Sequence, residues 1–115
     1  MLLEGKVAIV TGSAVGVGRA IAIALAREGA CVTVNYSKSE KDAQETARAI
    51  TDAGGRCLLV QANVAVDAEA RTLVARTVEE FGRLDILVNN AGITRFIPFA
   101  DLEAVPDDVW NTLYD

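Results

Sequence analysis

The fold is decided by a glycine-rich stretch, TGSAVGVG at residues 11–18, which joins the apolar run VAIV at residues 7–10 to the alanine-rich residues 19–27. A β-branched run followed at once by helical periodicity predicts a buried strand that turns directly into a helix. Gly12 would allow the tight turn. Gly16 and Gly18 have no Cβ atom, so a pyrophosphate could approach the backbone closely and the helix could pack closely against the sheet. The N–H groups of the first helical turn would then face an anion.

The chain has 115 residues, of which 51% are hydrophobic, and this length predicts one domain with a substantial core. No apolar run approaches the ~20 residues that span a bilayer, and the first residues lack the pattern of a secretory signal. We therefore expect no membrane insertion and a cytoplasmic location. The formal charge of −5 is spread without a basic patch, which argues against a nucleic-acid partner.

The sequence has two cysteines, Cys31 and Cys57, and no histidine, so no spacing is typical of a metal site. Disulfides are rare in the cytosol. We therefore expect no bound metal and two buried, reduced thiols near strands.

Apolar runs alternate with segments of helical period, which predicts strand–helix–strand units and a parallel sheet. We expect strands at residues 6–11, 31–36, 56–61 and 85–89. Three helical faces are predicted from apolar residues that recur at intervals of three and four: Ile21, Ala24 and Leu25; Ala43, Ala47 and Ile50; Val74, Thr77, Val78 and Phe81.

The predicted helices have recognisable ends. Gly29, Gly54 and Gly82 follow them where a left-handed residue would close each helix, and Asp67 is placed to cap the third. Right-handed crossovers between parallel strands give the order 3-2-1-4, with the fourth strand as an unprotected edge.

After Gly92 the pattern changes. Residues 93–106 hold both prolines and are predicted to form a long loop. Asp107 and Asp108 then suit the first turn of a helix that continues through Leu113.

Three segments read together resemble the short-chain dehydrogenase/reductase family: Thr11-Gly12-x-x-x-Gly16-x-Gly18, then Asn63-Val64, then Asn89-Asn90-Ala91-Gly92. The chain is similar to the N-terminal half of a classical member, in particular of the 3-oxoacyl-carrier-protein reductase and glucose dehydrogenase types. The resemblance implies an α/β fold, a doubly wound parallel sheet of the Rossmann type, of which residues 1–115 form the dinucleotide-binding N-terminal half. It also implies hydride transfer between NAD(P)(H) and an alcohol or carbonyl substrate, and homo-oligomers in full-length members.

The resemblance also assigns cofactor contacts. The pyrophosphate would lie over Gly12, Ser13, Val15, Gly16, Val17 and Gly18. Asn63 and Val64 would lie beside the adenine, where the Asn63 side-chain carbonyl could accept from the exocyclic amine, although an ordinary strand-end turn residue is the alternative. Asn90, Ala91 and Gly92 would lie at the nicotinamide-side ribose, whereas Asn89 and Asp85 are interpreted as structural.

The choice between NADH and NADPH depends on the end of the second strand, where an acidic residue would bind the ribose hydroxyls and exclude a 2′-phosphate. Tyr36 stands there instead, and Ser37 and Lys38 can donate to a phosphate, so NADP(H) is favoured with NAD(H) left open. Two observations oppose this preference. Val15 occupies a position where phosphate-preferring members often carry a basic residue, and Lys38 can also be an ordinary solvated lysine.

Members of the family use a tyrosine as general acid or base, its pKa lowered by a lysine four residues later. Neither Tyr36 nor Tyr114 is followed by such a lysine, so we predict no catalytic residue here and a catalytic half outside this chain. Two functions stay open: part of a complete oxidoreductase acting on a small-molecule alcohol or ketone, and a truncated nucleotide-binding module without redox activity. A structural remnant is a third. The exposed edge predicts that the isolated chain is unstable or self-associates.

Overall fold

The computed structural model describes residues 2–90 and 94–96. Strands and helices alternate from Val7 to Val88, as predicted, because apolar strand runs are separated by segments with one apolar helical face. The elements are β1 (Val7–Val10), α1 (Gly16–Arg27), β2 (Cys31–Tyr36), α2 (Glu40–Asp52), β3 (Cys57–Gln61), α3 (Asp67–Phe81), β4 (Ile86–Val88) and β5 (Thr94–Phe96).

The strands form one sheet in the order β3-β2-β1-β4-β5, and the first four are parallel. This arrangement confirms the predicted Rossmann-type order 3-2-1-4. The prediction that the fourth strand is an unprotected edge was wrong, because β5 pairs with β4 in the antiparallel direction, with Val88 opposite Thr94 and Ile86 opposite Phe96. β5 lies inside residues 93–106, which were predicted as loop throughout. A strand of three residues is too short to give a periodic signal.

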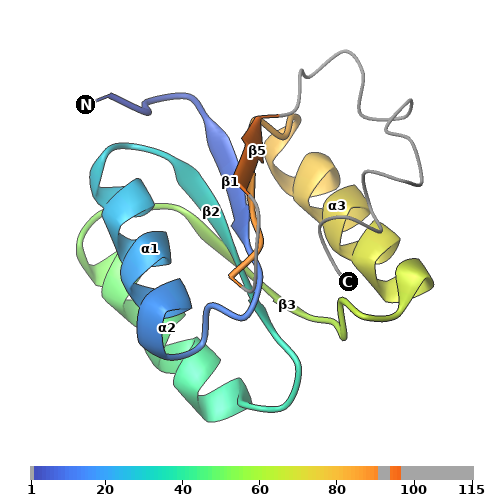
Figure 1. Cartoon of the computed structure of the whole chain (residues 1–115). Helices are drawn as coiled ribbons and strands as arrows, with labels where there is room; N and C mark the ends of the chain where they lie inside the picture. The colour runs from blue at the N-terminus through green and yellow to red at the C-terminus, as the bar shows by residue number, and fades with distance from the viewer. Residues whose placement is uncertain (1, 91–93, 97–115) are drawn as a thin grey trace.

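The two faces of the sheet carry separate helices. α1 and α2 lie on one face and α3 lies on the other (Figure 1). Successive side chains of a strand point to opposite faces, so Ala8 and Val10 of β1 join the core under α1 and α2. Ile9 between them joins the core under α3 with Leu73 and Leu87. Each face therefore has its own apolar core.

The helical faces differ in detail from the prediction. α1 is buried through Gly18 and Ala22, while Ala24 is exposed. α2 is buried through Ala43, Thr46 and Ile50, so that a threonine occupies the place predicted for Ala47. On α3 the buried residues are Ala70, Leu73, Val74 and Thr77, and the predicted Val78 and Phe81 are half-buried. The smallest side chains of α1 face the sheet, which lets the helix approach it closely.

The glycines that end the helices have the predicted left-handed backbone, with φ of 95° at Gly29, 88° at Gly54 and 84° at Gly82. The prediction that Asp67 caps α3 was wrong. The cap position is Val66, and Asp67 is the first helical residue, where it pairs with Arg71 at 2.9 Å. A carboxylate is favourable at either position, because both lie near the positive end of the helix dipole.

Asp85 is structural, as predicted. Its carboxylate accepts the Val7 N–H at 2.9 Å and two bonds from the Arg83 guanidinium, at 2.8 and 2.7 Å. Burial acts to raise the pKa of Asp85, but the bonds from Arg83 and Val7 and the charges of Arg83 and Lys6 lower it below its usual value. The ionised carboxylate thus ties the start of β4 to the start of β1.

Both cysteines are free thiols, and they are half-buried rather than fully buried as predicted. Burial raises the pKa of the Cys57 thiol to about 11, so this thiol stays protonated at neutral pH. In the described part of the chain no group of three potential metal ligands occurs, and none of its helices has the length and apolarity that a membrane crossing requires.

Candidate cofactor site

The carboxyl ends of β1, β2 and β3 lie together at the lower side of the molecule in Figure 1, where the glycine turn (residues 11–18) leads into α1. Gly12 and Gly16 have left-handed φ values of 58° and 62°, which favour glycine. Gly18 is required for another reason. A Cβ there would overlap the Gly12 carbonyl oxygen and come within 3.0 Å of the Ser13 Cα, so only glycine lets α1 start against the turn.

The N-terminus of α1 is open. Its cap residue is Val15, no side chain caps the helix, and its first turn has no acidic residue. The Arg19 N–H bonds to the Val15 carbonyl at 3.3 Å, and the amides of Gly16, Val17 and Gly18 precede it at the positive end of the helix dipole. Val15 and Val17 are 51% and 67% exposed. This helix end therefore offers backbone donors to an anion, with no protein carboxylate in the way.

Ser13 faces inward rather than toward solvent. It is fully buried, and its hydroxyl donates to the Val10 carbonyl at 2.7 Å and accepts the Asn35 N–H at 3.0 Å. The Ser13 N–H donates to the Asn35 carbonyl at 2.9 Å. The polar groups of Ser13 thus hold the turn against β2.

Asn35 is a site residue that the sequence interpretation missed. It is 2% exposed, and its side-chain oxygen accepts the Gly12 N–H at 3.1 Å. Its amide nitrogen donates to the Val60 carbonyl at 3.3 Å and to the Ala62 carbonyl at 3.2 Å. The available signal was an asparagine inside the apolar run CVTVNY of β2, because a buried amide must find hydrogen-bond partners.

Thr46 was also missed. This buried residue of α2 donates its hydroxyl to the Ala14 carbonyl at 2.9 Å, which fixes the glycine turn from the side of α2. The signal available in the sequence was a hydroxyl-bearing residue on the apolar face of the predicted helix, between Ala43 and Ile50, where it needs a hydrogen-bond partner.

Asn90 contacts the glycine turn directly. Its backbone N–H donates to the Thr11 hydroxyl at 3.2 Å, and its side-chain amide donates to the Gly12 carbonyl at 3.4 Å. The Thr11 N–H in turn donates to the Val88 carbonyl at 3.0 Å. The structure thus brings the ends of β1 and β4 together as the motifs predict. Ala91 and Gly92 lie outside the described residues.

The residues predicted to choose between the two cofactors fall into two groups. Tyr36 is 9% exposed, and its side chain joins the core beneath α1 and α2. Ser37 and Lys38 are exposed beyond it. The Gln61 side chain, at the end of β3, donates to the Ser37 carbonyl at 3.0 Å. Gln61 therefore holds the exposed loop in place, a contact that no sequence pattern indicated.

Asn63 lies in the turn between β3 and α3, residues 62–66, which we call the adenine turn after the contact that the family resemblance predicts for it. Its exposed side-chain oxygen accepts the Ala65 N–H at 3.1 Å, and its backbone N–H donates to the Glu69 carboxylate at 2.9 Å. Val64 is half-buried and packs against the core under α3. The carbonyl oxygen of an amide has two lone pairs, so the Asn63 oxygen can accept one further bond.

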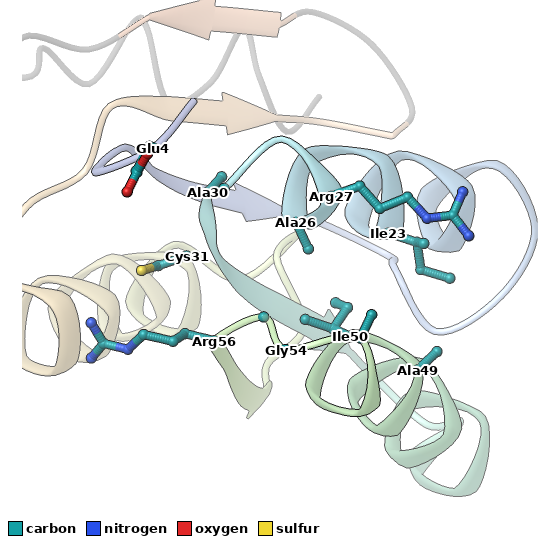
Figure 2. A pocket seen from close by; sticks show the side chains of 13 residues that line it. Glu4, Ile23, Ala26, Arg27, Ala30, Cys31, Ala49, Ile50, Gly54 and Arg56 are labelled. Carbon is teal, nitrogen blue, oxygen red and sulfur yellow. The ribbon is translucent and has the colours of Figure 1, made fainter. Parts of the chain in front are cut away.

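A pocket of about 420 Å³ lies elsewhere, between the C-terminal halves of α1 and α2. Figure 2 shows Ile23 and Ala26 of α1 directed toward Ala49 and Ile50 of α2. The pocket lies at the amino ends of β2 and β3, opposite the glycine turn, and it is lined by none of the predicted site residues that the structure describes.

Comparison with known proteins identifies the family. The model of the short chain dehydrogenase family matches residues 6–115. The chain belongs to the short-chain dehydrogenase family. A short-chain dehydrogenase from Burkholderia cenocepacia, solved in complex with NADP, has 45% sequence identity and a TM-score of 0.77 over 99% of this chain and 46% of its own.

The chain covers very different shares of two curated relatives. An uncharacterised oxidoreductase of Methylorubrum extorquens is 49% identical over 98% of this chain, which spans 44% of that protein. A short-chain dehydrogenase/reductase homologue of Bacillus subtilis, YusS, is 46% identical over 95% of this chain and 100% of its own length. This short-chain dehydrogenase chain thus spans less than half of one relative and the whole of another.

Proteins of the short-chain dehydrogenase family bind NAD or NADP, as the NADP complex and an NAD(P)-dependent L-rhamnose 1-dehydrogenase among the relatives illustrate. The residues present fit such a group. The space beside Gly16 is open, since a Cβ there would meet nothing within 4 Å, and the adjoining end of α1 has no acidic residue. The glycine turn and α1 can therefore hold a phosphate group.

Proposed function

We propose that this chain is the cofactor-binding half of an NAD(P)-dependent oxidoreductase, with NADP(H) preferred, acting on a small-molecule alcohol or ketone. The observation that carries the proposal is the N-terminus of α1, which has no side-chain cap and no acidic residue in its first turn. This helix end follows the glycine turn, where Gly18 packs against the Gly12 backbone. The bound nicotinamide would supply or accept a hydride. We further propose that the active form is a cytoplasmic homo-oligomer.

The roles of this chain's residues follow from their positions. The amides of Gly16, Val17 and Gly18 would donate to the pyrophosphate, which the positive end of the α1 dipole stabilises. Asn63 would bind the adenine through the free lone pair of its side-chain oxygen, with Val64 beside it. Asn90, already bonded to Thr11 and Gly12, would hold the backbone near the nicotinamide-side ribose.

The preference for NADP(H) is supported by the absence of a carboxylate from Tyr36, Ser37 and Lys38, where one would repel a 2′-phosphate. Lys38 is exposed, and the bond from Gln61 to the Ser37 carbonyl holds the loop that carries it. A charge-assisted contact from Lys38 would add to NADPH affinity alone.

Titration calorimetry with NADPH and NADH tests both parts of this proposal. We expect Lys38→Glu to weaken NADPH binding from a few-fold to about a hundred-fold, since one charge-assisted bond is worth about 1.5–3 kcal/mol. NADH binding should change little, and Lys41→Glu on the exposed side of α2 is the matched control. Tighter binding of NADH than of NADPH would reject the preference, and binding of neither would reject the cofactor site.

A second candidate is a nucleotide-binding module without redox activity. It is favoured by the full coverage of the Bacillus subtilis homologue and by Tyr36, which is followed four residues later by Glu40 and not by a lysine. Oxidation of NADPH by the purified chain with a panel of aldehydes and ketones separates the two. Turnover rejects the module, whereas cofactor binding without turnover supports it.

A further inference from the structure

The glycine turn and the adenine turn are connected by Asn35. On one side its side-chain oxygen accepts the Gly12 N–H at 3.1 Å, and on the other its amide nitrogen donates to the Ala62 carbonyl at 3.2 Å. Ala62 precedes Asn63 and its own N–H donates to the Tyr36 carbonyl at 2.9 Å. One buried side chain therefore joins the two segments proposed to hold the two ends of the adenosine diphosphate moiety.

Two other buried polar side chains at the glycine turn, those of Ser13 and Thr46, do not connect it to the adenine turn. The Ser13 hydroxyl bonds Val10 and Asn35, and the Thr46 hydroxyl bonds Ala14 and Asp42, so these bonds do not extend to β3 or to the adenine turn. Asn35 is 2% exposed, and both ends of its amide are satisfied. An amide held in this way at both ends adopts one orientation, which fixes the distance between the groups that it joins.

The bond to Gly12 has a second effect. It occupies the Gly12 N–H, while the Ser13 N–H is bonded to the Asn35 carbonyl at 2.9 Å. The amides of Gly12 and Ser13 are thus engaged within the protein, whereas the first turn of α1 offers its amides to a phosphate. Asn35 thus orients the glycine turn. It also engages the amides of Gly12 and Ser13 in the fold and leaves those of the first turn of α1 for a ligand.

We infer that Asn35 is a positioning residue that sets the separation between the glycine turn and the adenine turn, and so selects a ligand long enough to occupy both. This inference rests on the proposed cofactor site. A dinucleotide must contact both turns at once, so its affinity depends on their separation. A ligand that contacts the adenine turn and Lys38 but not the glycine turn does not depend on it.

The test compares NADPH with adenosine 2′-monophosphate, which carries the adenine and the 2′-phosphate but no pyrophosphate. In the full 115-residue chain, Asn35→Ala should weaken NADPH binding about ten-fold or more, while binding of the 2′-monophosphate, followed by NMR titration, changes less than about three-fold. Asn35→Asp keeps an acceptor for Gly12 and loses both donors to β3 and the adenine turn. It should show the same selective loss.

Thr33→Val is the matched control, because Thr33 lies on the same strand, is fully buried and bonds Thr77 at 2.8 Å. It removes a buried hydrogen bond under α3 without touching either turn. We expect lower stability and an unchanged ratio of NADPH to 2′-monophosphate affinity. If the substitutions acted only through stability, the ratio would change equally in Asn35→Ala, Asn35→Asp and Thr33→Val. That result would overturn the positioning role.

Amide hydrogen exchange of the cofactor-free chain gives a readout that does not depend on binding. The Gly12 amide should exchange slowly in the wild type, Asn35→Asp and Thr33→Val, and about ten-fold faster or more in Asn35→Ala. Unchanged exchange in Asn35→Ala, or equal losses of both ligands, would overturn the inference. If the wild type bound no NADPH but exchange behaved as expected, the proposed function would fail while the tie between the two turns stood.

Discussion

The N-termini of α1 and α3 differ in charge although the chain reaches them in the same way. Residues 11–15 connect β1 to α1 and residues 62–66 connect β3 to α3. Each helix has a valine at its cap position, Val15 or Val66, with extended backbone and no side-chain cap. The first turn of α3 contains Asp67 and Glu69, and Glu69 accepts the Asn63 N–H at 2.9 Å. The first turn of α1 contains no acidic residue.

This difference shows how one topology supplies both a structural and a binding helix end. The positive end of the α3 dipole is neutralised by carboxylates of the chain itself, which stabilises the fold without any ligand. The end of α1 leaves its amides to an external anion, and the space beside Gly16 is open. The amino-acid choice in the first turn decides between the two.

Gly18→Ala is the strongest test of the comparison. Its Cβ would overlap the Gly12 carbonyl oxygen, which belongs to the backbone and cannot rotate away. We expect a stability loss of up to about 3 kcal/mol, typical of overpacking, and no measurable NADPH binding by calorimetry. Gly82→Ala at the end of α3 is the control, because a Cβ there meets nothing within 4 Å. It should cost about 1 kcal/mol for its left-handed φ and leave affinity unchanged.

Val17→Glu gives α1 the charge that α3 already carries. Val17 is 67% exposed, so the new carboxylate finds space and interacts favourably with the helix dipole. Urea unfolding should show about 0.3–1 kcal/mol of added stability, while NADPH affinity falls about ten-fold or more through charge repulsion. The uncharged Val17→Gln separates charge from size. Equal NADPH affinity in both variants and the wild type would place the pyrophosphate elsewhere.

Asp67→Asn makes α3 more like α1 and has the smallest expected effect. The Asp67–Arg71 pair is exposed, with side-chain exposures of 66% and 47%, so most of the loss comes from the helix dipole. We expect a stability loss of about 0.5 kcal/mol at low salt that shrinks as salt increases. NADPH affinity should stay constant. Loss of affinity here would contradict the separation of roles between the two helix ends.

Much of the site could be predicted from sequence because its chemistry is local. The left-handed backbone at Gly12 and the start of α1 behind it follow from neighbouring residues, and the motif at Asn90 places that residue after β4. The partners of Asn35 and Thr46 could not be predicted in this way. Each bonds to carbonyls on other elements, and those pairings exist only once the sheet and α2 have packed.

The edge of the sheet shows the same limit. The strand order 3-2-1-4 follows from alternating patterns and right-handed crossovers, but β5 was missed because three residues carry no periodicity. Pairing of β5 with β4 protects a strand that is buried throughout, Ile86–Val88. The expectation of an exposed fourth strand was therefore wrong, while the instability or self-association of the isolated chain stays a prediction.

The sequence by itself determined the family, the parallel order of the first four strands and the location of the glycine turn, because periodicity and glycine conformation act over a few neighbouring residues. Only the tertiary structure decided which polar groups are available at the site. Asn35 occupies the Gly12 amide and joins it to the Ala62 carbonyl. Hydrogen bonds between distant segments depend on distances that packing sets, and no local pattern records those distances.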